Sequence, residues 1–175
     1  RLEYRGYDSA GVATVTGGRV EARKKSGKLV NLINEIEESP VAPASLGIGH
    51  TRWATHGGPT DQNAHPHLAD GGKLAVIHNG IIENFAELKG SLLAEGHTFE
   101  SQTDTEVAAK LIGRFFAGEA QGDLTEAMRL ASNELEGAFT LLAVHADQPD
   151  RVVASRRNSP LVIGLGAVSY THLTL

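Results

Sequence analysis

The apolar positions of this chain recur with two periods, one typical of strands and one typical of helices. Alternating or β-branched runs predict strands over residues 12–16, 19–24, 47–53, 74–78, 137–144, 151–155 and 161–165. Gly17-Gly18 between the first two predicts a hairpin turn. The run 74–78 is almost continuously apolar, which is typical of a strand buried on both faces.

One helix is predicted by the spacing of its apolar residues. Leu29, Leu32, Ile33 and Ile36 follow the i, i+3, i+4, i+7 pattern of one helix face, because positions three and four apart lie on the same side of an α-helix. We expect this face to be buried and the helix to end near Glu38.

Three further helices are predicted by residues that cap helix N-termini, namely Asn84, Thr103 and Asp123. The segment from Thr103 to Glu106 matches a capping box, in which the glutamate reaches back to the backbone N–H of its own cap. Asp123 with Glu126 repeats this signature. The helix that follows Asn84 is expected to bury Phe85, Leu88, Leu92 and Leu93.

Together these elements predict an α+β fold. Strands come in hairpin-linked groups and helices come in pairs, which favours mostly antiparallel sheets covered by helices over a strictly alternating parallel fold. The chain has 175 residues, of which 41% are hydrophobic and 21% are charged. This length and composition fit one globular domain with a full core.

Charge and cysteine content exclude several function classes. A net charge of −5 and a pI near 5.9 argue against nucleic-acid and anionic-membrane partners, which need a concentrated basic patch. The short basic cluster 23–25 is expected to be a solvated edge. No apolar run approaches the roughly 20 residues of a bilayer span, and no signal-peptide pattern is present, so we expect a cytoplasmic protein. With zero cysteines, these residues hold no disulfide, thiolate metal site or cysteine nucleophile.

The segment from Gly47 to His67 concentrates the candidate chemistry. It carries a guanidinium, an indole, hydroxyls and imidazoles between glycines. Each buried polar group left unpaired would cost about 1–3 kcal/mol, so the segment is typical of a binding loop rather than of a core strand. Arg52 is the leading candidate, because its planar fork can bind a carboxylate through two parallel hydrogen bonds. The alternative is a structural arginine paired with an acidic residue.

Two further candidates lie outside that segment. The strand 74–78 is expected to end in His78-Asn79-Gly80, which is either an ordinary turn or an oxyanion hole formed by the Asn79 amide and the Gly80 N–H. Asp104 falls in the first turn of a predicted helix, where the helix dipole keeps a carboxylate ionised. It either stabilises the helix or binds an ammonium group. Together with Arg52, these groups describe a site for acyl chemistry on an amino acid that still lacks a nucleophile.

The tryptophan and the histidines leave alternatives open. Trp53 is either a core aromatic or part of the loop that follows it. His65-x-His67 places two imidazoles on one side of a strand, and His50 or His56 could supply a third ligand to a metal. No carboxylate is interleaved with them, which favours histidines that hydrogen-bond backbone carbonyls over a metal site. We therefore expect no metal and no cofactor.

Six motifs, in the same order and spacing, carry a resemblance to a known family. They are residues 4–11, 50–57, 63–67, 78–84, 103–107 and 135–139. These motifs resemble the glutaminase domains of the isomerizing glutamine–fructose-6-phosphate aminotransferases, which are class II glutamine amidotransferases. The likeness extends from Arg1 to about Gly166. Other class II amidotransferases have a site of the same kind, but their sequences are less similar to this chain at motifs 50–57 and 63–67.

The resemblance implies an N-terminal-nucleophile fold, an αββα sandwich with two antiparallel sheets between helical layers. It also implies hydrolysis of glutamine to glutamate, with delivery of ammonia for glucosamine 6-phosphate synthesis. By that likeness Arg52 would bind the α-carboxylate of glutamine and Asp104 its α-amino group. Asn79 and Gly80 would form the oxyanion hole.

The same resemblance assigns further roles. Trp53, Thr55 and His56 would lie on a mobile glutamine loop, with Trp53 gating ammonia toward a sugar-phosphate domain. Arg5 would help to order the loops around the nucleophile. Full-length members of the family would be homodimers, and fructose 6-phosphate would bind only through a C-terminal isomerase domain.

The chain departs from the family pattern at both ends. The family's nucleophile is a cysteine at the mature N-terminus whose α-amino group serves as base, and this chain begins after that point. We therefore expect these residues alone to be inactive. Residues 1–166 match the amidotransferase domain without its nucleophile segment, whereas residues 167–175 are expected to be an unrelated tail. The alternatives are the glutaminase domain of another class II amidotransferase and an inert amino-acid-binding fragment.

Overall fold

The computed structural model describes residues 6–165 and 171–174 of the chain. Helices and strands follow one another in small groups, as the sequence predicts. In chain order they are β1 (Ser9–Thr16), β2 (Arg19–Ser26), α1 (Leu29–Glu38), β3 (Leu46–Arg52), β4 (His67–Ala69), the short helical turn η2 (Asp70–Gly72), β5 (Leu74–Ile82), α2 (Phe85–Ala94), α3 (Asp104–Ala117), α4 (Leu124–Glu134), β6 (Gly137–His145), β7 (Gln148–Arg157), β8 (Val162–Leu165) and β9 (Thr171–Thr174).

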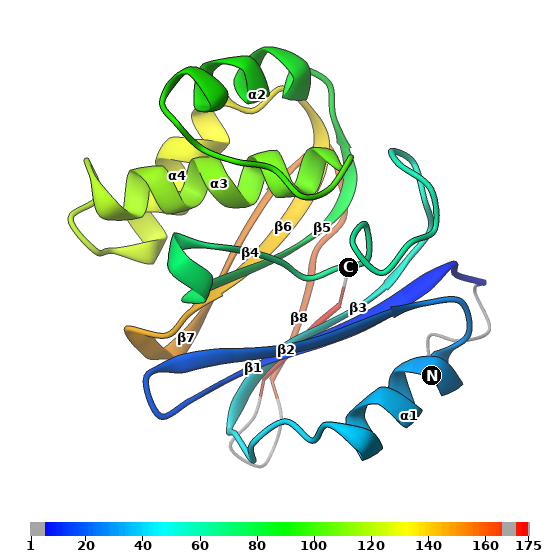
Figure 1. The fold of residues 1–175 in the computed structure, drawn as a ribbon. Coiled ribbons are helices and arrows are strands. Elements are labelled where there is room, and N and C mark those ends of the chain that lie inside the picture. The colour runs from blue at the N-terminus through cyan, green and yellow to red at the C-terminus, as the bar shows by residue number, and fades with distance from the viewer. Residues whose placement is uncertain (1–5, 166–170, 175) are drawn as a thin grey trace.

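The strands form two main antiparallel sheets that lie face to face. Their orders are β2-β1-β3 and β4-β5-β6-β7, and β8 pairs with β9 separately. Figure 1 shows α2, α3 and α4 on the outer side of the four-stranded sheet and α1 on the outer side of the three-stranded sheet. The αββα sandwich with antiparallel sheets is thereby confirmed. None of the helices in the described ranges is long and apolar enough to cross a bilayer.

Strand β5 supplies both hydrophobic cores, because successive side chains of a strand point to opposite faces. Leu74 and Val76 pack with the helices in one core. Ala75 and Ile77 pack with residues of the three-stranded sheet in the other core. The prediction of a strand buried on both faces is confirmed, since residues 74–78 are all buried.

Two of the predicted helix faces are only partly correct. In α1 the buried residue is Leu32, whereas Ile33 is 46% exposed. In α2 Leu92 is buried, but Leu93 is 52% exposed. Helix α1 packs on β1 and β2 of a small sheet, so only one row of its side chains meets protein.

The caps follow the prediction in part. Thr103 Oγ1 accepts a hydrogen bond from Glu106 N, as expected. The Glu106 carboxylate, however, reaches past the cap and accepts from the backbone N–H groups of Glu100 and Ser101 at 3.0 and 2.6 Å. The side chain of Asn84 makes no cap bond and instead bridges to the backbone of residues 134 and 136. The capping motifs therefore predicted where the helices begin more accurately than they predicted which hydrogen bonds form at those positions.

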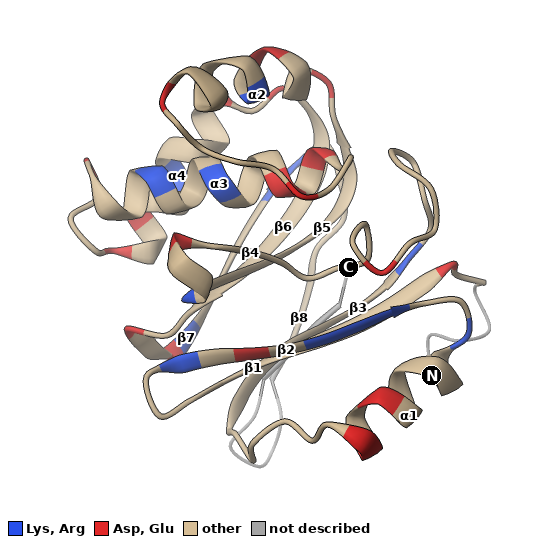
Figure 2. Ribbon diagram, in the orientation of Figure 1, with Lys and Arg blue, Asp and Glu red and all other residues tan. Residues whose placement is uncertain are grey.

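The basic cluster on β2 is not a solvated edge. Figure 2 shows it as a continuous blue stretch along this strand. Arg23 donates to the backbone carbonyl of Ser39, and Lys25 forms ion pairs with Glu35 and Asp61. Lys24 donates to two backbone carbonyls of the segment before β4. These side chains tie β2 to its neighbours.

Gly11 lets the segment before β4 cross the three-stranded sheet. A Cβ at Gly11 would lie 2.0 Å from the carbonyl oxygen of His65, whereas a Cβ at Gly49 on the adjacent strand would make only an ordinary contact at 3.5 Å. We predict that Gly11→Ala lowers the free energy of unfolding by about 3 kcal/mol, because backbone must move to relieve the overlap. Gly49→Ala is the matched control and should change it far less. Urea unfolding of both variants measures this difference in the free energy of unfolding. Equal stabilities of the two variants would contradict the close crossing at Gly11.

Candidate functional site

Arg52 is the last residue of β3, and the chain that follows wraps around its guanidinium. Its side chain is 4% exposed. The Nη2 group donates to the carbonyl oxygens of His56 and Gly57, the latter at 3.2 Å, and Nη1 donates to the carbonyl oxygen of Gly58 at 3.4 Å. Residues 53–58, here called the Arg52 loop, are therefore folded around one buried cation.

Asp8 is the acidic partner of Arg52, and the sequence analysis gave it no role. Its Oδ1 lies 3.5 Å from Nη1 of Arg52, and its Oδ2 accepts a hydrogen bond from the backbone N–H of Ala54. The Asp8 N–H also donates to the Arg52 carbonyl at 2.8 Å. Arg52 thus pairs with an acidic residue, as the structural alternative predicted. The signal available in the sequence was Asp8-Ser9 directly before a strand, within the motif 4–11.

Asp104 lies at the N-terminus of α3, where a carboxylate is favoured, and is buried. Its Oδ2 accepts a hydrogen bond from Ile82 N at 3.0 Å, which fastens α3 to the end of β5. Two imidazole nitrogens flank it without hydrogen bonding to it: His56 Nδ1 at 3.9 Å from Oδ2 and His78 Nδ1 at 3.8 Å from Oδ1. Burial lowers the pKa of Arg52, while the negative charges of Asp8 and Asp104 act to raise it. Asp104 therefore lies within electrostatic reach of Arg52.

Asn79 and Gly80 lie within β5, and the strand does not end there as expected. Pairing with β6 carries β5 on to Ile82. Gly80 adopts φ +129°, and a Cβ there would lie 2.1 Å from the carbonyl oxygen of Ala138, so only glycine fits. Asn79 alternates with the buried His78 and is itself exposed. It therefore shares the strand face of Ile77, which points toward the three-stranded sheet.

The Arg52 loop holds three other predicted site residues. Trp53 is 72% exposed, so the core-aromatic alternative is wrong. Thr55 is exposed as well. The His56 ring meets the edge of Phe85 at a centroid distance of 4.9 Å, and its Nδ1 is buried without a hydrogen-bond partner in the described structure. Arg5 lies outside the described residues.

The histidines form a hydrogen-bonded chain. His50 Nδ1 and His65 Nδ1 are 2.9 Å apart, and Thr105 Oγ1 bridges His65 Nε2 at 2.8 Å to His78 Nδ1 at 3.0 Å. His67 Nε2 contacts the hydroxyl of Thr103 at 2.9 Å. Threonine hydroxyls are thus the main hydrogen-bond partners of these histidines, whereas backbone carbonyls were predicted. In the described part of the chain no three His, Asp or Glu side chains are grouped to hold a metal ion.

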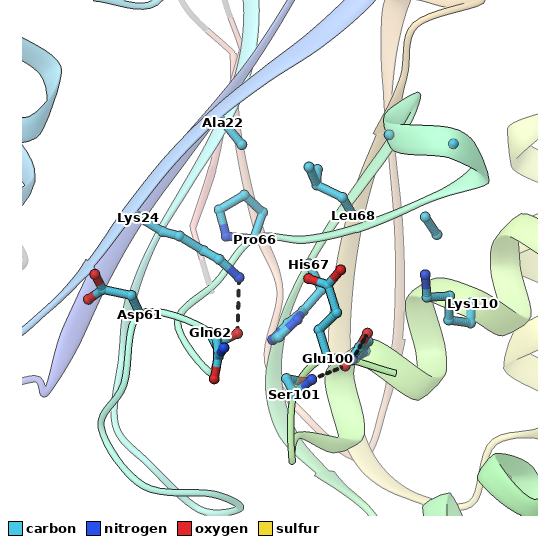
Figure 3. Close-up of a pocket in the computed structure, with 14 residues that line it drawn as sticks. Ala22, Lys24, Asp61, Gln62, Pro66, His67, Leu68, Glu100, Ser101 and Lys110 are labelled. Atoms are coloured by element: carbon cyan, nitrogen blue, oxygen red, sulfur yellow. Dashed lines mark hydrogen bonds between the residues drawn. The ribbon is translucent and has the colours of Figure 1, made fainter. Parts of the chain in front are cut away.

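A separate cleft of about 510 Å³ lies between β2, β4 and the start of α3 (Figure 3). Lys24 enters it from β2 and donates to the carbonyls of Gln62 and Ala64. Glu106 on the opposite wall accepts from two backbone N–H groups, and Asp61 accepts from the N–H and hydroxyl of Ser26. Lys24, Glu106 and Asp61 are therefore already paired within the chain.

A series of contacts links the four separate segments that carry Arg52, Asp8, Asp104 and the Asn79-Gly80 pair. Arg52 binds the His56 carbonyl, the His56 ring faces Asp104, and Asp104 is bound to the strand that carries Asn79. These contacts include the Arg52 cation and the Asp104 carboxylate, one oxygen of which is unoccupied by hydrogen bonds in the described structure. Chemically, a cation and a carboxylate are the partners that a small zwitterion requires.

Comparison with known proteins gives a consistent family. A model of the glutamine amidotransferase domain matches residues 50–167. The glutamine–fructose-6-phosphate aminotransferase [isomerizing] of Corynebacterium diphtheriae is 70% identical over 166 residues, which are 95% of this chain and 27% of that protein. The protein of the same name from Streptomyces coelicolor is 61% identical over 170 residues, 97% of this chain and 27% of its own length. The chain thus spans about a quarter of the curated relatives that it matches.

Solved structures share the fold. The glutamine phosphoribosylpyrophosphate amidotransferase of B. subtilis superposes with a TM-score of 0.78 at 26% identity, covering 98% of this chain and 36% of that one. A glutamine aminotransferase class-II domain protein from Silicibacter pomeroyi gives a TM-score of 0.63 at 15% identity, covering 98% and 81%. The second likeness concerns the fold alone.

The buried histidines predict a pH dependence of stability. Burial, aided by the positive charges of His78 and Arg52, lowers the pKa of His50 from 6.5 to about 3, and burial also lowers the pKa of His65 and His67. Because the unfolded chain then binds protons first as the pH falls, the stabilisation is present above pH 6.5 and is lost below it. One such histidine costs about 2 kcal/mol between pH 7 and pH 5.

We expect urea unfolding of the unmodified chain to show this loss in the free energy of unfolding between pH 7 and pH 5. In His50→Asn the loss should be smaller by about 2 kcal/mol, because the amide can replace the imidazole Nδ1 as a hydrogen-bonding group but does not titrate. The comparison between the two proteins removes the contribution of carboxylates, which both share. Equal losses in the two proteins would contradict a His50 that stays neutral in the folded chain.

Proposed function

The chain belongs to the glutamine amidotransferase domain family, and on that premise we propose that it binds glutamine between Arg52 and Asp104. We further propose that it is the glutaminase part of an isomerizing glutamine–fructose-6-phosphate aminotransferase, hydrolysing glutamine to glutamate and supplying ammonia to fructose 6-phosphate. The choice within the family rests on relatives of that name at 52–70% identity, compared with 26% for the phosphoribosylpyrophosphate enzyme.

Asp104 is the proposed partner of the α-ammonium group. One carboxylate oxygen is used by the Ile82 N–H, and in the described structure the other, Oδ1, accepts no hydrogen bond. An ammonium donor bound there gains a charge-assisted bond in a site from which water is largely excluded. The N-terminus of α3 keeps Asp104 in the ionised form that this bond requires.

Arg52 is the proposed partner of the α-carboxylate. The loop carbonyls and Asp8 engage Nη1 and Nη2, whereas the Nε–H of the guanidinium makes no hydrogen bond in the described structure and remains for a carboxylate. The bound carboxylate would join the loop carbonyls around one cation. This arrangement couples the Arg52 loop to the ligand, and it supports a role for Thr55 and His56 as loop residues that close on glutamine.

Asn79 and Gly80 are the proposed oxyanion hole. Attack on the side-chain amide of glutamine places negative charge on its oxygen, and the Asn79 amide with the Gly80 N–H would stabilise that charge. The attacking thiolate is not supplied by these 175 residues, which contain zero cysteines. Within the proposal, the cysteine and its α-amino group come from outside the printed sequence.

Further assignments complete the proposal. Trp53 would gate the passage of ammonia, since its large exposed ring follows the buried Arg52 directly. Arg5 would order the loops around the nucleophile. Fructose 6-phosphate would bind to a C-terminal isomerase domain, and the full-length enzyme would be a cytoplasmic homodimer that needs no cofactor.

Calorimetry with glutamine tests the proposed site. We expect Asp104→Asn to weaken glutamine binding at least about tenfold, because a charge-assisted bond to the ammonium is lost. Asp123→Asn is the matched control: Asp123 also accepts backbone N–H groups at a helix start, but it lies on the surface at α4. Arg52→Lys should weaken binding as well, because a lysine cannot replace the fork. Unchanged affinity in Asp104→Asn and Arg52→Lys would overturn the proposed site.

A further inference from the structure

Asp8 holds two different parts of the site with one carboxylate. Its Oδ1 faces the Arg52 guanidinium at 3.5 Å and accepts from the Ser9 hydroxyl at 3.0 Å. Its Oδ2 accepts from the backbone N–H of Ala54, the second residue of the Arg52 loop. Both oxygens are therefore acceptors, and a side chain with only one acceptor cannot serve both partners.

The surroundings of Asp8 make this contact costly to replace. Arg52 is 4% exposed, and Asp8 is the one acidic residue within ion-pair distance of it in the described structure. A buried cation needs a nearby anion to offset its desolvation. Asp8 is 24% exposed, and it is fixed by its own backbone, since its N–H binds the Arg52 carbonyl and its carbonyl accepts from Gly27 N.

We propose that Asp8 is a positioning residue that sets the orientation of the Arg52 fork and the start of the Arg52 loop, and thereby makes the site select ligands with an α-carboxylate. This inference rests on the proposed function. Asp8 and the Gly58 carbonyl fix the fork at Nη1, and the carbonyls of His56 and Gly57 fix it at Nη2. These contacts set the direction of the Nε–H, which makes no hydrogen bond in the described structure. Asp8 does not itself touch the ligand, because its two oxygens are committed to protein groups.

Asp8→Asn is the informative variant, because it keeps the shape of the side chain and removes one acceptor. An amide that keeps its oxygen toward Ala54 N turns its NH₂ toward Arg52, and the opposite rotamer turns NH₂ toward the Ala54 N–H. Either way two donors face each other. Ser9→Ala is the control, since it removes a neighbouring hydrogen bond to the same carboxylate and leaves both key contacts in place.

The first measurement compares glutamine with 4-aminobutanamide, which has the same amide and amine but no carboxylate. We expect Asp8→Asn to weaken glutamine binding about tenfold and to leave the affinity for 4-aminobutanamide unchanged, so that the preference for glutamine shrinks by the same factor. An equal loss for both ligands would reduce Asp8 to a general structural role. Tighter glutamine binding would mean that the charge of Asp8 only repels the carboxylate. Either result overturns the inference.

The second measurement needs no ligand. Trp53 is the only tryptophan of the chain and directly precedes Ala54, so its fluorescence anisotropy reports how firmly the start of the loop is held. We expect a lower anisotropy in Asp8→Asn and no change in Ser9→Ala. Unchanged anisotropy in Asp8→Asn contradicts the inference. If the unmodified chain binds no glutamine while the anisotropy falls as expected, the proposed function fails and the loop-positioning role of Asp8 stands.

Discussion

The site depends on one constraint, which is the burial of the Arg52 guanidinium at the end of β3. A desolvated cation must be offset by an anion, and its donors must find acceptors. Asp8 and the carbonyls of residues 56–58 meet these two requirements. The same contacts bend the chain after β3 into a loop, so the electrostatics of one side chain determines the path of the backbone beside the site.

Contacts between the layers of the sandwich hold the other groups of the proposed site. Strand β5 is buried on both faces, and Asn79 shares the face of Ile77 on the side of the three-stranded sheet. Asp104 is held against the same strand by the N–H of Ile82. Thr105 then joins His65 to His78. Asp104, His65 and His78 are thus each fixed by a contact between elements that are distant in the sequence.

Local sequence signals predicted the features that depend on local bonds. The Gly17-Gly18 turn has both glycines at positive φ, and the caps Thr103 and Asp123 accept the backbone N–H groups expected of them. The choice of Arg52 and Asp104 as neighbours came from chemical complementarity and from family motifs.

Features that depend on tertiary neighbours could not be predicted in the same way. Periodicity gives a helix face but not how much of it is covered, which is why Ile33 and Leu93 are exposed. An Asn-Gly pair suggests a turn, yet pairing with β6 carries the strand through it. The role of Asp8 depends on a residue that lies 44 positions further along the chain, and no local pattern records that contact.

The most direct test of this account is a crystal structure of the chain grown with glutamine. The account predicts electron density for the ligand with its carboxylate on the Arg52 fork, its ammonium within hydrogen-bond distance of Asp104 Oδ1, and its side-chain amide near the Asn79-Gly80 pair. Glutamine bound elsewhere, for example in the cleft of Figure 3, with the Arg52 and Asp104 site empty, would contradict it.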